Sequence, residues 1–384
     1  MKVKISSIFC IYLLSLPFTQ ALTLNIGFPL KLCELLLFCL LFLYLYIGKA
    51  SKTLIHLLVK YKAVTFLLIW VLLSFLINAY WYYNYPPKPL PFRISAAGDS
   101  FLRLCYIVLN IVAFFISVIL LIKHPKQILN LWITGALLAA VYAWYLFVSS
   151  GLNLPYIKLF GMEDAPQNLR GFIRCGTFKE GNFFGLYLIL SAVIAFYLNK
   201  IKSGVFLLIT IVTTFSTISV VSAIVLILFV VRKQFLKKKV LIVFFIALPF
   251  VIGSVVYLVK TPYFQKFIYA KITEPSNVLT TSNFSKVDRT LTARIGFFQG
   301  IDNPFFGVGP YNYGLHYDRY NDFETYITNN NDWSLKFFPR PNRRRIPNNV
   351  YIEVFAVYGL VGFLFISLIF NWDSAENIAN GALK

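Results

Sequence analysis

The chain is poor in acidic residues, histidine and cysteine, and these shortages exclude several kinds of site. Asp and Glu total 15 against 36 Lys and Arg, with three histidines and five cysteines. The sequence contains no CxxC or HExxH pattern, so a thiol redox centre or a zinc site of these types is not expected. His316 lies near Asp318 and Asp322 and is the nearest approach to a metal-ligand group, and we expect no metal there.

The cysteines are predicted to be small buried apolar residues rather than reactive thiols. Four of them, Cys10, Cys33, Cys39 and Cys105, fall in or beside apolar stretches, and only Cys175 lies in a predicted outer loop. No outer disulfide is therefore expected within the chain.

Long apolar stretches dominate the sequence, with 58% hydrophobic residues and a mean hydropathy of +0.70. About 20 apolar residues in a helix cross a bilayer, and only helices or closed barrels satisfy their backbone there. We therefore predict an all-α, polytopic bundle of about ten transmembrane spans. Residues 203–231 are too long for one span and indicate two short helices meeting near 216–219. The other expected spans are 5–22, 29–47, 63–81, 102–122, 127–149, 182–198, 239–259 and 350–370.

Lysine-rich short loops predict the orientation, because cytoplasmic loops carry an excess of basic residues. This places the amino terminus in the cytoplasm and leaves two long loops, 150–181 and 260–349, outside. Residues 1–22 also resemble a signal peptide, but they lack a good small-residue cleavage site, so a retained helix is favoured.

Three regions follow from this topology. Residues 1–259 form the amino-terminal transmembrane helices, 260–349 a large and partly helical outer loop, and 350–384 the last span with a short tail. The loop is long enough to fold as a cap. The outer loops are also basic, against the usual bias, which indicates a function for their arginines.

The first candidate segment runs from Asn168 to Asn182 and leads into an apolar helix. Thr177 is predicted to cap that helix, with Glu180 completing a capping box. Arg170 and Arg174 then lie just outside the bilayer, where a lipid phosphate would lie, because arginine suits phosphate oxygens. The alternative is a capped helix start with interfacial arginines.

The second candidate segment is 288–304, where apolar residues recur at helical spacing. It predicts an amphipathic helix with Asp288 as a possible cap and Arg294 at the apolar margin, reaching lipid headgroups. Arg289 lies on the same helix. The apolar positions are Leu291, Ile295, Phe298 and Ile301.

The third candidate segment precedes the last span and contains Arg345, Asn348, Asn349 and Glu353. Carboxamides and a carboxylate at a helix entrance suit the hydroxyl groups of a sugar. The arginine run 343–345 has the alternative explanation of solvated charge attracted to anionic lipid.

Together the three segments resemble the family of O-antigen ligases and O-antigen polymerases, which are bacterial membrane glycosyltransferases. The family pattern has an arginine before G-T-F-x-E-x-N, an arginine on a loop helix, an N-P-x-x-G-x-G turn, and H-N-x-Y-x-E before a span with G-x-x-G. The matching positions, within a similar region of about 100–370, are Arg174 with 176–182, Arg294, 303–309 and 349–362.

This resemblance implies a glycan donor on undecaprenyl pyrophosphate, used at the periplasmic face of the inner membrane without metal, cofactor or nucleotide sugar. It implies catalytic roles for Arg174, Arg294 and Glu353, with both arginines facing one outer cavity that holds the pyrophosphate. A chain-length regulator is a candidate partner beside the bilayer, and nucleic acid is not. The residues expected to bind substrate are Arg170, Glu180, Asn182, Arg289, Arg345, Asn348 and Asn349.

The sequence departs from the family pattern in three places. Asn348 replaces the histidine proposed as general base, and asparagine takes no proton at neutral pH, so Glu353, His316 or another group would serve, or activity is impaired. The junction at 216–219 lacks the arginine of a T-x-S-R segment. The chain also ends soon after the last span, where relatives continue, which indicates a truncated product.

Polymerase and ligase differ only in the acceptor, which is another lipid-linked repeat or the lipid A core. The replacement of the histidine favours a polymerase. A polysaccharide transporter or flippase is the alternative of another class, and it would carry ionisable residues in the middle of its spans. An inactive remnant is the last alternative.

Overall fold

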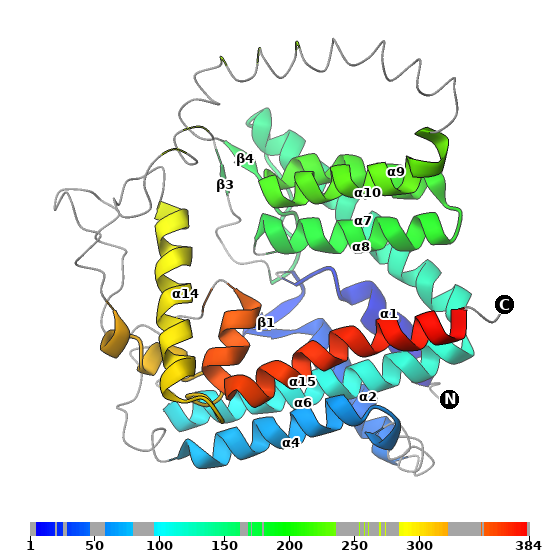
Figure 1. Ribbon diagram of the computed structural model, residues 1–384. Helices are drawn as coiled ribbons and strands as arrows, with labels where there is room; N and C mark the ends of the chain where they lie inside the picture. Colours follow the sequence, from blue (N-terminus) through cyan, green and yellow to red (C-terminus); the bar gives the residue numbers. More distant parts are fainter. Residues whose placement is uncertain are drawn as a thin grey trace. The chain divides into compact units, whose positions relative to one another are not determined.

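The computed structural model describes most of the chain as helices joined by turns and two short hairpins (Figure 1). It forms two compact units. Unit 1 comprises Met1–Lys52 and Val112–Phe245, and unit 2 comprises Thr53–Ile111 and Ile246–Lys384. The described residues are 5–19, 21–25, 29–46, 58–79, 96–161, 168–169, 171–178, 180–235, 284–321, 347 and 349–381, with the isolated positions 253, 257, 260, 269 and 273.

Each predicted span contains a helix except 239–259, which lies almost wholly outside the described residues. The first two spans are wrong at one end each, because the first helix ends at Ser15 and residues 29–31 form a strand. Within the described residues, three stretches are long and apolar enough to cross a bilayer: Ser100–Lys123, Pro125–Gly151 and Val350–Ile369. The helical class is confirmed, whereas the count of ten spans and their orientation stay predictions. The helices are α1 (Ile5–Ser15), α2 (Leu32–Tyr46), α4 (Lys62–Ile77), α6 (Ala96–Lys123), α7 (Pro125–Gly151), α8 (Gly181–Tyr197), α9 (Ile201–Thr210), α10 (Thr217–Phe235), α14 (Phe284–Asp302) and α15 (Val350–Gly381).

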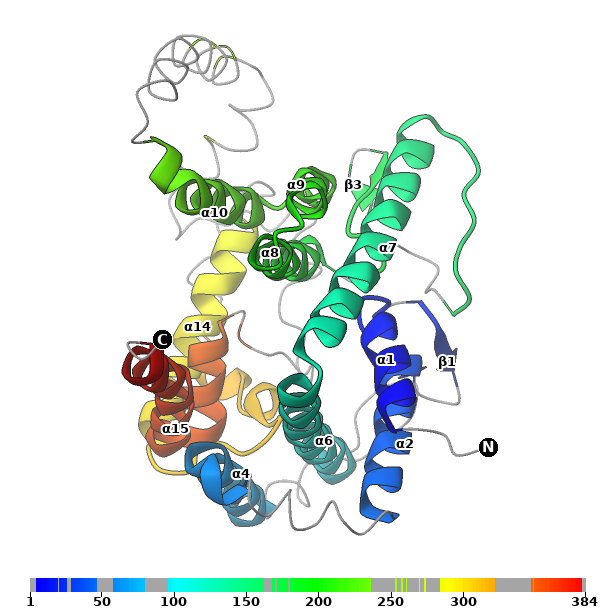
Figure 2. The same cartoon turned by 90° about the vertical axis from the view of Figure 1, so that its right-hand side faces the viewer.

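In unit 1, a stripe of alanines lets α7 pack closely against α8 and α9 (Figure 2). Small residues allow helix backbones to approach, which is how apolar helices gain contact where water does not drive them together. Phe184 and Leu188 of α8 and Leu207 of α9 fill the space beside the stripe, and all three are fully buried. The alanines are Ala136, Ala139, Ala140 and Ala143.

The predicted meeting of two short helices within 203–231 is confirmed, because α9 ends in a 3-10 turn, η1 (Ile211–Thr214), before α10 begins. Phe215 between them has left-handed backbone angles, with φ 47°. Hydroxyl groups satisfy the freed backbone: Thr214 donates to the Ile211 carbonyl and accepts from the Ser216 amide. Such local hydrogen bonds compete with helix formation, which explains why the helix breaks in a Thr/Ser-rich segment.

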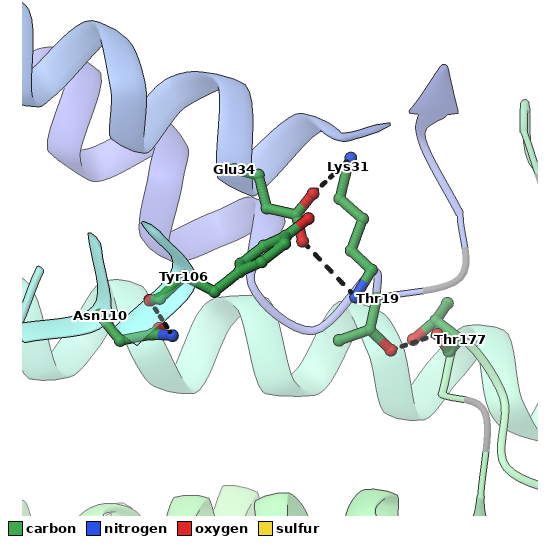
Figure 3. Close-up of polar contacts among 6 residues, drawn as sticks. All are labelled: Thr19, Lys31, Glu34, Tyr106, Asn110 and Thr177. Carbon is green, nitrogen blue, oxygen red and sulfur yellow. Dashed lines mark hydrogen bonds and ion pairs between the residues drawn. The ribbon is translucent and has the colours of Figure 1, made fainter. Parts of the chain in front are cut away.

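Two antiparallel hairpins, β1 (Thr23–Asn25) with β2 (Pro29–Lys31) and β3 (Asn168–Leu169) with β4 (Phe172–Ile173), flank the helices of unit 1. The second is fixed to α7, since the Ile173 amide donates to the Ser150 hydroxyl at 2.8 Å. Figure 3 shows the start of α2, where the Glu34 carboxylate accepts from the Lys31 amide and lies 3.8 Å from its Nζ.

Unit 2 is built on α14 and α4, which both pack against α15 (Figure 1). Val287, Leu291 and Ile295 form the buried face of α14 and are fully buried against Ala356 and Val357. The predicted loop helix is confirmed, but its buried face continues through Gln299, while Phe298 and Ile301 are 40% and 48% exposed.

The helix α15 bends sharply at Gly359, whose φ of 69° and ψ of −171° are not helical (Figure 1). The turn 303–309 fills this break: the amides of Val308 and Gly309 donate to the carbonyls of Ala356 and Val357, and the Leu360 amide donates to the Pro304 carbonyl. The backbone of one segment thus completes the hydrogen bonds of the other.

Side chains of α4 satisfy further carbonyl groups at the break. The Trp70 indole donates to the Tyr358 carbonyl at 2.9 Å, and the Ser74 hydroxyl donates to the Phe306 carbonyl at 2.7 Å. Trp70 also stacks on Phe306, with 4.5 Å between ring centroids. Non-helical backbone at membrane depth needs protein partners of this kind, because lipid supplies none.

We expect Gly359→Ala to destabilise the protein far more than Gly171→Ala. Both glycines have positive φ, but a β-carbon on Gly359 would lie 2.3 Å from the Phe305 carbonyl oxygen, whereas Gly171 has nothing within 4 Å. Gly171→Ala should cost about 1–2 kcal/mol from backbone strain alone. Gly359→Ala should cost about 3–5 kcal/mol, because overpacking adds to the strain. Thermal unfolding of the detergent-solubilised proteins measures both, and equal losses would contradict the interlocked break.

Candidate functional site

In unit 1, Arg174 lies between the hairpin β3–β4 and the start of α8. The next two residues, Cys175 and Gly176, have φ of 81° and 55°, so the chain reverses immediately after the arginine. Cys175 is 1% exposed, and burial raises the pKa of its thiol. It is therefore a packed residue and a poor nucleophile.

The predicted capping box is wrong. The helix begins at Gly181, Glu180 occupies the cap position with extended backbone and makes no side-chain cap hydrogen bond, and Thr177 lies one turn too early. The left-handed turn at Cys175 and Gly176 sends Thr177 toward α1 instead. Its hydroxyl donates to the Pro17 carbonyl, and its own carbonyl accepts from Thr19 at 3.1 Å (Figure 3).

The guanidinium of Arg174 lies directly against the first residue of α8. A β-carbon on Gly181 would lie 3.1 Å from Arg174 Nη2 and 2.5 Å from the Thr214 carbonyl oxygen. Arg174 Nε is buried and has no hydrogen-bond partner within the described part of the chain. Since a helix start carries partial positive charge from its unpaired amides, the guanidinium and the helix start together favour an anion.

Asn182, also predicted from sequence, joins a polar cluster at the junction of α9 and α10. Its Oδ1 accepts from the Ser216 hydroxyl at 2.6 Å, and Ser216 accepts from the Ser219 hydroxyl at 2.8 Å. Ser219 also lies against Gly185 of α8. The cluster fixes the start of α8 to the helix junction and thereby positions the surroundings of Arg174.

We expect Gly181→Ala to disturb this arrangement, with Gly135→Ala as a control. The added β-carbon at position 181 would overlap the Thr214 carbonyl, whereas a β-carbon on Gly135 meets its nearest atoms at 3.5 Å, which is ordinary contact. Gly181→Ala should lower the free energy of unfolding by about 1–3 kcal/mol. Gly135→Ala, inside α7, should leave it unchanged or raise it by up to about 1 kcal/mol. Thermal melts compare the two, and a neutral Gly181→Ala would contradict the close approach.

In unit 2, Glu353 lies in the first turn of α15, with 22% of its side chain exposed. Arg103 of α6 lies beside it, with Nη2 3.5 Å from Glu353 Oε1. Arg103 is not among the residues predicted from the sequence, although it is the only charged residue in the apolar stretch 100–122. That isolation was the available signal, because charge in an apolar helix is costly and usually functional.

Asn349 caps α15, since its Oδ1 accepts from the amides of Tyr351 and Ile352 at 3.0 and 3.3 Å. Asn349 therefore has a structural role as a helix cap. Its contact with a sugar stays a prediction. Arg289 and Arg294 are exposed on α14, and the Arg294 guanidinium lies 5.7 Å from the centroid of the Phe298 ring. The predicted cap Asp288 is wrong, because α14 begins one turn earlier at Phe284.

His316 lies in the buried part of unit 2 and is 8% exposed. Burial lowers the pKa of its imidazole to about 4, and the nearby Arg319 contributes to the lowering. The ring is therefore neutral in the folded protein at neutral pH and a weak base. No three His, Cys, Asp or Glu side chains come together within the described residues, and Asp322 lies outside them.

The stability should depend on pH through His316. The pKa of the imidazole is about 4 in the folded protein and 6.5 in the unfolded chain, so between these two values the unfolded chain binds the proton and the folded protein does not. Stability is complete above pH 6.5 and falls by up to about 3 kcal/mol as the pH decreases to 4. Thermal melts at pH 7.5 and 5 should show that His316→Gln removes this part of the loss.

The comparison at pH 7.5 is the control, because the ring is then neutral in both states and any difference reflects packing alone. An unchanged acid loss in the variant would show that His316 does not carry it.

The remaining predicted residues divide between the two units or lie outside the described structure. Arg170, Arg345 and Asn348 are outside it. Arg174 belongs to unit 1 and Arg294 to unit 2, and the outer cavity that they were predicted to share stays a prediction.

Residues 203–367 match the family model described as O-Antigen ligase. The matched part covers the α9–α10 junction, α14, the turn 303–309 and the break in α15. No curated protein and no solved structure matches the chain. The family match confirms the resemblance to this family, with the second and third segments inside the matched residues and the first, which contains Arg174, before them.

Proposed function

Because residues 203–367 match the O-antigen ligase family, we propose that this chain is a membrane glycosyltransferase. It moves a glycan from undecaprenyl pyrophosphate to a sugar hydroxyl at the periplasmic face of a bacterial inner membrane. The observation that carries the proposal is Glu353, a half-buried carboxylate in the matched segment, held beside a guanidinium at the start of an apolar helix.

Glu353 is the general base of the proposed reaction. The family histidine position holds Asn348, which takes no proton at neutral pH. Of the two groups considered from sequence, His316 is buried and has its pKa lowered to about 4, whereas Glu353 is partly exposed. A base must reach the proton that it removes, so exposure favours Glu353.

The reaction transfers one glycosyl group. The acceptor hydroxyl oxygen forms a bond to the anomeric carbon of the donor sugar while its proton passes to the Glu353 carboxylate. The bond from that carbon to the pyrophosphate oxygen breaks, and its electron pair leaves with the pyrophosphate. The products are the extended glycan and undecaprenyl pyrophosphate.

Arginines stabilise the negative charge that develops on the leaving group, and we expect no metal or cofactor to be required. Arg174 supports this role, because its guanidinium lies at the start of α8, where backbone amides also favour an anion. Exposed Arg294 on α14 is the second proposed contact. Fixed cations of this kind lower the barrier without reorganisation.

Polymerisation of lipid-linked repeats is the proposed reaction, and transfer to the lipid A core is the second candidate, favoured by the family description itself. A transporter is less well supported. Arg103 and Glu353, which form an ion pair in unit 2, lie near the ends of the apolar stretches Ser100–Lys123 and Val350–Ile369.

Surface polysaccharide from a deletion strain tests the proposal. The strain is complemented by wild type, Arg174→Ala, Arg294→Ala, Glu353→Gln or the control Arg319→Ala. Arg319 is an exposed arginine that pairs with Asp302 at 3.8 Å, so its removal matches the loss of one positive charge. We expect Arg174→Ala, Arg294→Ala and Glu353→Gln each to reduce glycan transfer by roughly 10²–10³-fold, which removes the ladder of polymer bands on a gel. The control should keep it.

The pattern of bands from the deletion strain identifies the acceptor. A single-repeat band after deletion indicates a polymerase, and loss of all capped core with accumulated lipid-linked polymer indicates a ligase. An unchanged ladder after deletion, or a full ladder from Glu353→Gln with normal protein levels, would contradict the proposal.

A further inference from the structure

Arg103, Tyr311 and Glu353 come from three distant parts of the sequence and meet in unit 2. The Arg103 guanidinium lies 6.0 Å from the centroid of the Tyr311 ring and 3.5 Å from the Glu353 carboxylate. An arginine over an aromatic ring gains a cation–π attraction, and beside a carboxylate it gains an ion pair. The guanidinium is thus held from two sides.

Tyr311 has unusual backbone geometry at this point. Its φ is 63°, in the left-handed region that residues other than glycine seldom adopt. Strain of this kind persists only where the surrounding structure enforces it, and it concentrates at functional sites. Here it accompanies the ring that contacts Arg103.

A chain of hydrogen bonds fixes the register between Arg103 and Glu353. Ser100, one helical turn before Arg103, bonds to Asn312 at 3.2 Å, and Asn312 donates to the Val308 carbonyl at 2.9 Å. The Val308 amide in turn donates to the Ala356 carbonyl, one turn after Glu353. Both Ser100 and Asn312 are fully buried, so this connection is shielded from water.

An arginine near the end of an apolar helix can also extend its side chain toward lipid headgroups. Extension toward headgroups does not account for the position of this side chain, because its guanidinium contacts Glu353 and Tyr311 within its own unit. Its side chain remains 46% exposed, so it lies at the accessible edge of the unit and not in its core.

We propose that Arg103 is a positioning residue for the reaction: it keeps the Glu353 carboxylate ionised and oriented toward the acceptor hydroxyl, with Tyr311 holding the guanidinium in place. A guanidinium beside a carboxylate favours its charged form, which is the form that accepts a proton. This inference rests on the proposed function, in which Glu353 is the base.

Two kinetic constants distinguish this role from direct binding of the donor. A residue that positions the base affects the chemical step, so its loss lowers kcat and leaves KM for the donor unchanged. A residue that holds the donor pyrophosphate raises KM when it is removed. Lysine keeps the positive charge but loses the planar fork, so it should restore part of the rate.

The test uses the full-length protein in proteoliposomes, with lipid-linked oligosaccharide extracted from the source bacterium as donor. The proteins are wild type, Arg103→Gln, Arg103→Lys, Glu353→Gln and the control Arg319→Gln. Initial rates give kcat and KM, undecaprenyl pyrophosphate serves as the binding probe, and thermal melts report folding.

We expect Arg103→Gln to lower kcat roughly 10- to 100-fold, which is less than the loss of the base itself, about 10²–10⁴-fold. The KM for the donor and the affinity for undecaprenyl pyrophosphate should stay within about twofold, and Arg103→Lys should be intermediate. If Arg103→Gln does not fold, a reduced kcat with unchanged KM in Arg103→Lys carries the same conclusion.

Different results overturn different claims. A wild-type rate in a folded Arg103→Gln protein, or a raised KM and weakened probe binding with unchanged kcat, would overturn the positioning role. An inactive wild type, or a fully active Glu353→Gln, would overturn the proposed function and this inference with it.

Discussion

The break in α15 at Gly359 imposes the constraint on which unit 2 depends: backbone groups released from a helix must find partners where lipid offers none. The turn 303–309 provides amides and a carbonyl, and α4 provides Trp70 and Ser74. The glycine and proline residues of this turn therefore have a physical purpose. They allow two backbones to approach closely enough to exchange hydrogen bonds, and so they fix the direction of the segment that carries Glu353.

Unit 1 follows the same principle at the junction of α9 and α10. The left-handed Phe215 interrupts the helix, and threonine and serine hydroxyls satisfy the released groups. The same cluster reaches Asn182 at the start of α8, against which Arg174 packs. In both units, the proposed functional side chain therefore lies next to an interrupted helix. Interruptions place polar backbone and charged side chains at the ends of otherwise apolar elements.

Hydrophobic patterning predicted the positions of the described helices. It also predicted the interruption near 216–219, because an apolar run that is too long for one span and polar in its middle favours two short helices. Local rules failed where a backbone turn decided the outcome. Thr177 matched a helix cap by spacing, but the left-handed angles of Cys175 and Gly176 direct it toward Pro17. Asp288 looked like the start of α14, yet the buried face already includes Val287.

The candidate site was predictable only where its residues belong to a local motif. Arg174, Asn182 and Glu353 stand in recognisable segments, whereas Arg103 is 250 positions from Glu353 in the sequence. No local pattern connects those two residues, and only contacts of α6 side chains with Asn312 and with Glu353 of α15 bring them together. The role of Tyr311 could not be predicted either, because its contact with Arg103 depends on a left-handed backbone angle.

The central claim is that this chain transfers a glycan from a lipid pyrophosphate with Glu353 as base. The most direct measurement is the release of undecaprenyl pyrophosphate by purified protein in proteoliposomes, followed by mass spectrometry together with the length of the glycan product. The account predicts one molecule released for each glycan transferred by wild type, and almost none from a folded Glu353→Gln protein. Glycan growth without release of the lipid pyrophosphate, or no release by folded wild type, would contradict it.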